Sequence, residues 1–468
     1  MAKDEAYYQG CNQHLLRAVP PSALRILEVG CAEGRFGAAL KQQNPRRVVH
    51  GIERESSIAA RAAQRLDRVL SIDIEREDVD AESGAFDCIT YGDVLEHLVD
   101  PWSVLRRHRR LLAAGGVVLC SVPNIQHHSI LKALLQGDFQ YAPSGLLDTT
   151  HLRFFTYSTF TKLLLDAGFE PSIVDVIEVP AGRKLLSAAQ PLLRLVGADS
   201  DRSRRYLNAH QYIFRAKPLD DPGEGEETPI TVVACVSDDA RMSANLLASP
   251  CLVPESRHEV MLMKGRRSAA EAYNEAIERS KNDIVVFVHQ DVYLPRGWPK
   301  RLVRSMARAD ETFGNVGIYG VYGASAGQAH AGYVVDRDML MHPAPSLPAQ
   351  VDTLDELLLV IHKPTPLRFD EQLGFHLYGA DICLAARAAG LRAVAIDALC
   401  FHNSLTAGLP AQFFRSGRVF ANKLAARLPV STACAEITPS WTRWPLQLER
   451  LTSALRDDLH KVRVWIGR

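Results

Sequence analysis

The sequence predicts two α/β domains joined by an acidic linker. Short runs rich in β-branched residues alternate with helix-spaced segments in the first half, and the same alternation starts again after residue 229. Between the halves lies KPLDDPGEGEETP, a stretch of prolines, glycines and acids with almost no apolar residues, which is typical of a linker. We therefore expect domains at residues 1–217 and 230–425, a linker at 218–229 and an amphipathic tail at 426–468.

Composition narrows the classes of function. The chain has 468 residues, and its 54 Lys and Arg balance its 54 Asp and Glu, so no net charge attracts a nucleic acid. Its nine Cys include no C-x-x-C pair, which argues against a disulfide scaffold and a thiolate zinc site. The first residues lack the apolar core of a signal peptide, and no apolar run is long enough to span a bilayer. A cytoplasmic protein that acts on a small neutral substrate or a glycan fits this pattern.

The first half reads as a parallel sheet covered by helices. Five β-rich runs, LRILEVG, VVHGIE, VLSIDI, FDCITYGD and GVVLCSVPN, are separated by helix-spaced segments such as WSVLRRHRRLL. FEPSIVDVIEVP and QYIFRAKP then predict a final pair of strands at one sheet edge. In such sheets, ligands bind at the carboxyl ends of the strands.

Polar and glycine residues gather at those carboxyl ends. The first strand ends in a turn containing Glu28, Gly30, Cys31 and Gly34, where glycines let backbone N–H groups approach a ligand. Ala32 breaks the dinucleotide pattern G-x-G-x-x-G, which disfavours a nicotinamide or flavin cofactor. At the end of the second strand Glu53 can accept both hydroxyls of a ribose, and at the end of the third Asp73 can accept from an exocyclic amine. Each acid alone is better explained as a cap, but the ordered series predicts a nucleoside site.

These residues resemble the class I S-adenosylmethionine-dependent methyltransferases across the whole first domain. LEVGCAEG is similar to their first motif, FDCITYGDVLEHLVDP to their fourth-strand motif, and LLAAGGVVLCSVPN to the fifth strand. The resemblance implies a Rossmann-like sheet that binds S-adenosylmethionine. It assigns the methionine part to Glu28 and Gly30, the ribose to Glu53, the adenine to Asp73 and Ile74, and the loop over the sulfonium to Asp93.

A segment between Asn124 and Tyr157 is placed to form the acceptor pocket, because insertions after the fifth strand usually do so in these enzymes. Its polar candidates for the acceptor are Asp148, His151 and Arg153. A hydroxyl acceptor must lose a proton, and a histidine with a near-neutral pKa suits a general base. His151 is one candidate for that base and His97, in LEHL, is the other. The structural alternative, a helix-packing His97 and a surface ion cluster at 148–153, stays equally open.

The second half contains its own polar strand ends. The apolar run DIVVFV stops at His289, Gln290 and Asp291, where an oxygen ligand suits a hard divalent cation and a histidine suits a metal or ribose. Ser237 and Asp238 end this domain's first strand. Asp381 begins a helix-spaced segment, and His402 follows the apolar run AVAIDALCF. Taken singly, Asp381 is a helix-start acid favoured by the helix dipole, and His402 a strand-end residue.

Together these residues resemble the family 2 inverting glycosyltransferases with a GT-A fold, from about residue 229 to about residue 425. The most specific stretches are AEAYNEAIERSKNDIVVFVHQDVYLP and FDEQLGFHLYGADICLAARAAG. The resemblance places Asn274 beside the nucleotide, makes Asp291 the metal-binding acid and Asp381 the catalytic base, and gives His402 a metal or diphosphate contact. It implies a nucleotide-sugar donor, a saccharide acceptor and Mn²⁺ or Mg²⁺.

The sequence as a whole predicts a bifunctional, glycan-modifying enzyme that transfers a methyl group and a sugar, as in polysaccharide biosynthesis. Two alternatives stay open. His289 replaces the first aspartate of the usual D-x-D pair, so the second domain could bind a glycan or nucleotide without catalysis. A membrane-associated scaffold is the other alternative, in which Arg415, Arg418, Lys423 and Arg427 contact the inner face of the membrane. A solvated basic helix face explains these four cations better.

Overall fold

The structure is a computed structural model that describes residues 11–182, 187, 191, 200–220, 227–337, 339–342, 346–404 and 409–443. The chain forms two compact units, Met1–Asp221 and Pro222–Arg468, and the division falls inside the predicted linker. Residues 221–226 of that linker and 444–468 of the predicted tail lie outside the described residues. Within the described residues, no helix has both the length and the apolar character needed to cross a bilayer.

The first unit is built on one seven-stranded sheet in the order β3-β2-β1-β4-β5-β7-β6. Its strands are β1 (Arg25–Val29), β2 (Val48–Ile52), β3 (Arg68–Leu70), β4 (Phe86–Gly92), β5 (Leu112–Pro123), β6 (Phe169–Glu178) and β7 (Ala209–Pro218). The five strands from β3 to β5 pair in parallel, and β7 and β6 pair antiparallel at one edge. Both the parallel sheet and the final strand pair confirm the expectation from the sequence.

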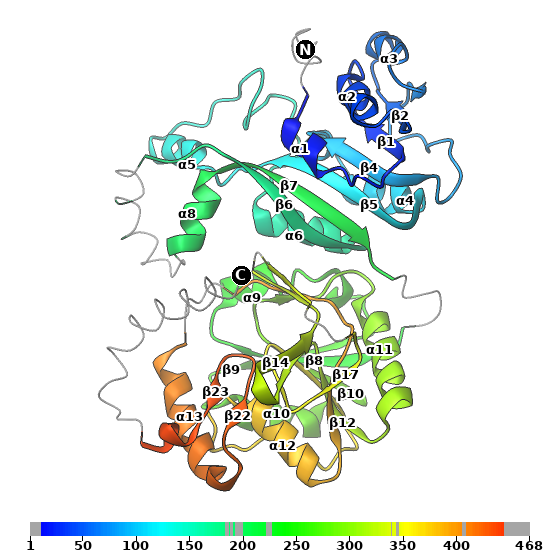
Figure 1. Ribbon diagram of the computed structural model, residues 1–468. Coiled ribbons are helices and arrows are strands. Elements are labelled where there is room, and N and C mark those ends of the chain that lie inside the picture. The colour runs from blue at the N-terminus through cyan, green and yellow to red at the C-terminus, as the bar shows by residue number, and fades with distance from the viewer. Residues whose placement is uncertain are drawn as a thin grey trace. The chain divides into compact units, whose positions relative to one another are not determined.

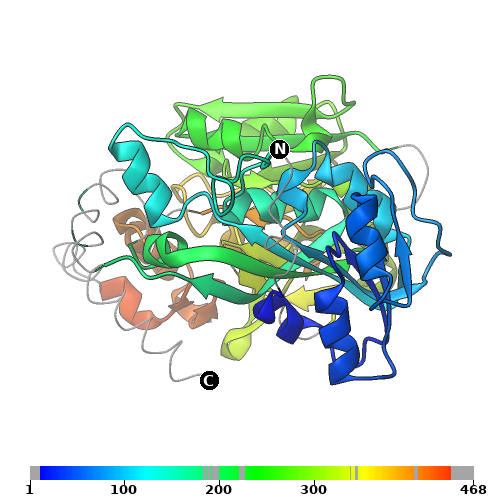
Figure 2. The ribbon, with the colours of Figure 1, turned by 90° about the horizontal axis from the view of Figure 1, so that it is seen from above.

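Helices cover both faces of this sheet (Figure 1). They are α1 (Gln13–Ala18), α2 (Arg35–Gln43), α3 (Ser56–Ala62), α4 (Pro101–Arg109), α5 (His128–Leu135), α6 (Tyr157–Asp166) and α8 (Ser200–Asn208), with the short 3₁₀ helix η2 (Leu95–His97) after β4. Apolar side chains of α1, α2 and α3 share one buried cluster with the sheet, and those of α4 and α6 share another. Seen from above, α5 lies at the far end of this unit from α2 and α3 (Figure 2).

The strand order reverses between β1 and β4, because β1 connects onward to β2 on one side and β4 to β5 on the other. A reversal of this kind opens a crevice at the carboxyl ends of the two strands, where ligands of such sheets bind. The glycine turn after β1 and the start of η2 after β4 both lie at this point. The fold therefore places the glycine turn and the loop after β4 where ligands of such sheets bind.

The second unit contains a mixed seven-stranded sheet in the order β17-β20-β12-β19-β10-β8-β9. Its strands are β8 (Ile230–Val236), β9 (Glu259–Lys264), β10 (Ile284–Val288), β12 (Val316–Gly320), β17 (Ala349–Val351), β19 (Leu358–His362) and β20 (Arg392–Ala395). Smaller sheets add β11 (Val292–Tyr293), β13 (Tyr322–Ser325), β14 (Ala329–Gly332), β15 (Val334–Asp336), β16 (Met339–Met341), β18 (Thr353–Leu354), β21 (Phe401–His402), β22 (Val430–Ser431) and β23 (Glu436–Ile437).

Helices also cover both faces of the second sheet, which makes this unit a three-layer α/β domain. They are α9 (Asp239–Ala244), α10 (Ala269–Arg279), α11 (Trp298–Phe313), α12 (Tyr378–Ala388) and α13 (Ala411–Lys423). Buried residues of α9 and α11, including Trp298 and Leu302, pack in one cluster with Val286 of β10. On the other face, the ring of Tyr273 in α10 lies 4.6 Å from that of Phe287 in β10.

The predicted tail differs from the expectation, because its described part belongs to the second unit's core. Trp441 stacks on Phe414 of α13 with ring centroids 5.6 Å apart, and both are buried. These residues share an apolar cluster with Leu377 and Ala380 near the start of α12. Within the described residues, the chain as far as Arg443 is thus packed structure, so the apolar face of α13 is already covered by its own domain.

Candidate functional site

The turn after β1 has the shape of a ligand cradle. Gly30, Ala32 and Gly34 have φ angles of +70°, +47° and +77°, a region that favours glycine and costs alanine energy. The amides of Gly30 and Cys31 donate to the Ile52 carbonyl at 2.8 and 2.9 Å, which fixes the turn to the end of β2. A Cβ added to Gly30 would lie 2.5 Å from a methyl carbon of Val94, so only glycine allows the loop after β4 to approach the β1 turn this closely.

Glu53 follows β2 directly and braces the same turn. One of its carboxylate oxygens accepts from the amide of Ala32 at 3.1 Å, and the other accepts from the amide of Glu55 at 3.0 Å. Each oxygen keeps a second lone pair, which is available to a hydroxyl donor. The position and remaining acceptor capacity of Glu53 thus fit the predicted ribose contact.

Two further acids at the crevice carry raised pKa values. Burial raises the pKa of Glu28 to about 8, although its carboxylate accepts from the Gly37 amide at 3.0 Å. Burial also raises the pKa of Asp93 to about 6, against the opposing effect of a hydrogen bond from Ser121. Asp93 additionally accepts from the Gln211 side chain at 2.8 Å. Ser121 and Gln211 are partners that the sequence did not single out.

The adenine contacts predicted from the third strand are displaced relative to that strand. β3 ends at Leu70, so Asp73 and Ile74 lie in the following loop rather than at the strand end. The carboxylate of Asp73 accepts from the Glu75 amide at 3.0 Å, which is a local turn contact, and Ile74 is buried. The run VLSIDI predicted a longer strand because it is apolar and β-branched, but pairing with β2 covers only residues 68–70.

In the second unit, three polar side chains converge where β10 ends. One ligand atom from each of His289, Asp291 and His402 lies within 4.8 Å of the other two, a spacing that can hold a metal ion. Pairing of β11 with β21 sets Val292 opposite His402, which brings Asp291 beside that histidine across 111 residues of chain. The His402 Nε2 lies 3.4 Å from the Asp291 carboxylate. The structure therefore unites residues that the sequence could only name separately.

Asp336, at the end of β15, orients His402 and was not predicted. Its carboxylate lies 2.9 Å from Nδ1 of His402 and accepts the proton on that nitrogen. The two flanking carboxylates, Asp291 and Asp336, raise the pKa of His402 to about 10 despite its burial. Histidine ligands of metals commonly donate their second nitrogen to a carboxylate in this way. Asp336 could be found in the sequence only as an acid after a β-prone run.

Gln290 and Asp238 hold the surrounding loops together. The side-chain oxygen of Gln290 accepts from the amides of Ser237 and Asp238 at 2.9 and 3.0 Å. Asp238 is the N-cap of α9, where its carboxylate accepts from the Arg241 amide at 2.9 Å. These contacts connect the end of β8 with the end of β10, so Ser237 and Asp238 border the cluster through their backbone.

Comparison with known proteins assigns both units. A family model described as a methyltransferase domain matches residues 4–172, and one described as a glycosyltransferase-like family matches residues 231–406. The chain joins a methyltransferase domain to a glycosyltransferase-like domain. This confirms the predicted pair of α/β folds and their order.

The first domain is similar to curated methyltransferases and to solved methyltransferase structures. The ubiquinone biosynthesis O-methyltransferase of Dinoroseobacter shibae is 30% identical over 157 residues, 32% of this chain and 62% of the relative. The enzyme of that name from Pseudomonas paraeruginosa is 31% identical over 159 residues, 32% of this chain and 66% of the relative. The chain thus spans less than two thirds of these relatives' length.

Two solved methyltransferases also align. One from Thermotoga maritima, described as a possible histamine N-methyltransferase, has 17% identity, a TM-score of 0.31, and coverage of 43% of this chain and 86% of its own. One from Mesorhizobium loti has 18% identity, a TM-score of 0.29, and coverage of 43% and 94%.

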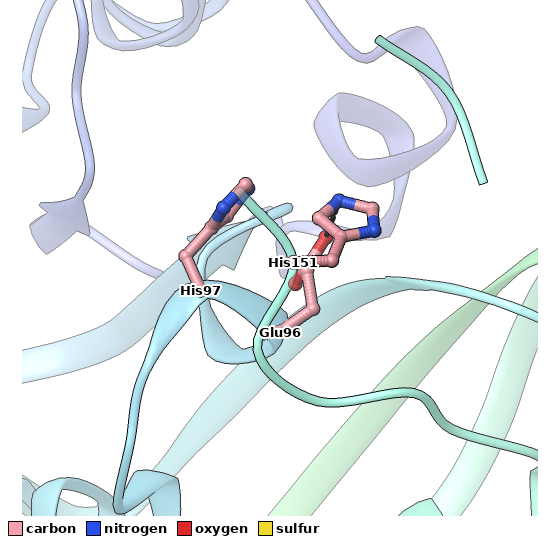
Figure 3. Close-up of side chains that lie close together, drawn as sticks. All are labelled: Glu96, His97 and His151. Carbon is pink, nitrogen blue, oxygen red and sulfur yellow. Dashed lines mark ion pairs between the residues drawn. The ribbon is translucent and has the colours of Figure 1, made fainter. Parts of the chain in front are cut away.

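The two candidate bases of the methyltransferase domain lie side by side. The rings of His97, in η2, and His151, in the segment after β5, have centroids 4.8 Å apart. Glu96 lies with them, and Figure 3 shows its carboxylate next to the His151 imidazole. The side chain of His151 is 6% exposed. Glu96 was not selected from the sequence, although it lies inside LEHL.

The segment after β5 that contains His151 is fixed to η2 through its backbone. The amides of Leu152 and Arg153 both donate to the Glu96 carbonyl, at 2.8 and 2.9 Å. Asp148 is 2% exposed and accepts from both the amide and the hydroxyl of Thr150 at 2.8 Å, so it is not part of a surface ion cluster. Arg153 donates to the Val99 carbonyl at 3.1 Å, and its guanidinium lies 5.6 Å from the centre of the Trp102 ring. In these contacts Asp148 and Arg153 act as positioning residues.

In the glycosyltransferase-like domain, Asp381 and Asn274 also have protein partners. Asp381 lies in the first turn of α12, and its carboxylate is 2.7 Å from the ammonium group of Lys423 in α13. Burial raises the pKa of Asp381, against the opposing effect of Lys423. Lys423 also pairs with Asp370 at 2.5 Å, so it is bound within its domain rather than offered to a membrane. Asn274 donates to the Phe369 carbonyl at 2.9 Å.

Proposed function

We propose that the protein is a bifunctional enzyme that modifies a saccharide or a glycosylated acceptor. Its first domain transfers a methyl group from S-adenosylmethionine to an oxygen atom, and its second transfers a sugar, with inversion, from a nucleotide sugar. The single observation that supports this best is the presence of two family matches, each covering a set of polar residues at the carboxyl ends of its own sheet. One chain that carries both activities keeps successive steps on one acceptor at high effective concentration.

The residues of the first crevice fit S-adenosylmethionine. The β1 turn, with Gly30 and Gly34 at positive φ, is placed to hold the methionine part. Glu53 offers lone pairs to the ribose hydroxyls, and Ile74 offers an apolar surface to the adenine. The bound cofactor supplies an electrophilic methyl group on a sulfonium. The protein must then orient the acceptor oxygen and take up its proton, and His97 and His151 are the groups suited to that transfer.

The cluster in the second domain fits a divalent cation on a nucleotide diphosphate. His289, Asp291 and His402 supply one carboxylate and two imidazoles, and Asp336 holds the His402 ring in a metal-binding orientation. Asp381 is assigned the role of base for the sugar acceptor, since its raised pKa makes it a better proton acceptor than a solvated aspartate. Lys423 maintains the ionised form of this carboxylate.

A second candidate function keeps the methyltransferase and makes the second domain a non-catalytic binding module. The observation that favours it is the histidine at position 289, where the resembling enzymes carry an aspartate, since this lowers the negative charge available to a cation.

A thermal-shift screen of the full chain, followed by an assay of sugar transfer, tests both candidates. S-adenosylhomocysteine at 100 times its dissociation constant should stabilise the folded chain by about 2.7 kcal/mol, and a nucleoside diphosphate should do so only with Mn²⁺. No response to S-adenosylhomocysteine would contradict the methyltransferase proposal. A nucleotide response without Mn²⁺-dependent turnover of any nucleotide sugar would favour the binding module.

A further inference from the structure

We propose that Glu96, His97 and His151 form a divalent cation site in the methyltransferase domain, in addition to the cluster in the second domain. One ligand atom from each residue lies within 4.8 Å of the other two. Glu96 and His97 come from η2, and His151 comes from the segment after β5, so the three converge from two parts of the chain (Figure 3). None of the three was expected to bind a metal.

The burial of Glu96 favours a cation site. Its residue is 0% exposed, and neither oxygen of its carboxylate has a hydrogen-bond partner within the described part of the chain. The nearby carboxylates of Asp93 and Asp148 add negative charge around it. A buried carboxylate without partners is costly, whereas coordination to a divalent ion would compensate both burial and the neighbouring negative charge.

Hydrogen bonds set both histidines in the form that binds metals. Nδ1 of His97 lies 3.1 Å from the carbonyl of Thr150, and Nδ1 of His151 lies 3.2 Å from the carbonyl of Leu146. A carbonyl can only accept, so in each ring we assign the proton to Nδ1 and the lone pair to Nε2. Asp148 reinforces this arrangement, because it accepts from the Thr150 hydroxyl, which is itself 3.0 Å from His97 Nδ1.

The Glu96–His151 separation fits shared coordination better than a direct ion pair. Nε2 of His151 is 4.0 Å from the nearest Glu96 oxygen, whereas a charge-assisted hydrogen bond would bring these atoms to about 2.8 Å. Two ligands bound at about 2.1 Å to one ion lie between about 3.0 and 4.2 Å apart, depending on the angle at the metal. The observed distance lies in that range.

Two imidazoles and one carboxylate favour a divalent transition ion or Zn²⁺ over Ca²⁺ or Mg²⁺, and three protein ligands leave coordination positions open. A hydroxyl oxygen of the acceptor in an open position would lose its proton more easily. In that step the acceptor O–H bond breaks and its proton passes to water, the donor's S–CH₃ bond breaks, and an O–CH₃ bond forms. With both imidazoles bound to the ion, water takes up the proton in place of His97 and His151, the bases named under the proposed function. This role rests on the proposed methyl transfer, whereas cation binding itself does not.

Titration with Co²⁺, followed by its visible absorbance, tests the site in the full chain. The background carries Asp291→Asn and His402→Gln, which disable the cluster in the second domain. We expect one Co²⁺ per chain, bound at least tenfold more weakly after Glu96→Gln or His151→Gln. Asp138→Asn, which removes an exposed carboxylate of the same segment, should leave Co²⁺ binding unchanged.

Each outcome decides one claim. Equal Co²⁺ affinity in Glu96→Gln and Asp138→Asn, with circular dichroism showing both folded, would overturn the site, as would the absence of Co²⁺ binding in the background protein. If Glu96→Gln does not fold, His151→Gln gives the same comparison. S-adenosylhomocysteine binding is measured on the same samples, and its absence throughout would contradict methyl transfer while leaving the result for the cation intact.

Discussion

Replacing Glu53 by Gln should weaken cofactor binding without unfolding the methyltransferase domain. The glutamate carboxylate braces the β1 turn through the Ala32 amide and has a lone pair left on each oxygen for the ribose. Gln keeps one acceptor oxygen but turns the other into a donor and removes the charge. Hydrogen bonds to a charged group contribute about 1.5–3 kcal/mol each, and Glu53 is half-exposed, so we expect a loss of about 1–3 kcal/mol. This corresponds to a dissociation constant for S-adenosylhomocysteine that is roughly 5- to 150-fold higher.

Isothermal titration calorimetry with S-adenosylhomocysteine measures this loss directly. The matched control is Glu55→Gln, two residues away, because the Glu55 side chain is exposed and, in the described structure, accepts one hydrogen bond, from the Ser57 hydroxyl at 3.2 Å. Its affinity should equal that of the wild type. An unchanged dissociation constant in a folded Glu53→Gln protein would refute the assignment of Glu53 to the ribose. It would also remove the main support for the proposed position of S-adenosylmethionine.

Three other perturbations give distinct outcomes. The pKa of Glu28 is raised from 4.5 to about 8, so its contribution to stability is present at low pH and is lost as pH rises through this window, with a slope of up to about 1.4 kcal/mol per pH unit. In Glu28→Gln, the free energy of unfolding in urea should therefore depend less on pH between pH 5 and 8. An unchanged pH dependence would contradict the burial of this charge. Asp291→Asn should weaken Mn²⁺-dependent nucleotide-sugar binding. Asp381→Asn should preserve that binding and lower single-turnover sugar transfer about 100-fold or more. Equal effects of the two substitutions would argue against separate roles. Lys423→Gln leaves Asp370 and Asp381 without their cation. It should lower the free energy of unfolding of the second domain by about 1–2 kcal/mol in chemical denaturation, a range that already takes account of the partial exposure of the lysine. A loss of vesicle binding without loss of stability would instead support the membrane alternative.

The sequence was most informative where one strand leads directly into one candidate ligand-binding residue. The alternating runs predicted all seven strands of the first sheet, and Glu53 was placed correctly because it directly follows β2. Asp73 was misplaced relative to its strand because strand length depends on pairing, and the partner strand β2 is available to only three residues of β3. The apolar, β-branched composition of a segment does not show where the strand that pairs with it ends.

Contacts between segments far apart in the chain could not be predicted from the sequence. His97 and His151 were considered as alternatives for one role, yet the backbone of the segment around His151 hydrogen-bonds to η2 and brings both rings together. Asp336 orients His402 from 66 residues away, and Lys423 pairs with an acid in another helix. Each of these pairings is set by the tertiary packing of loops and helices, which local periodicity does not encode.

The most direct test of two ligand sites, one in each domain, is calorimetric titration of the full chain with S-adenosylhomocysteine and then with a nucleotide sugar and Mn²⁺. The wild type should bind one equivalent of each. Glu53→Gln should weaken only the first binding event, and Asp291→Asn only the second. If either substitution weakened both, or if the wild type bound neither ligand, the assignment of one independent site to each domain would be contradicted.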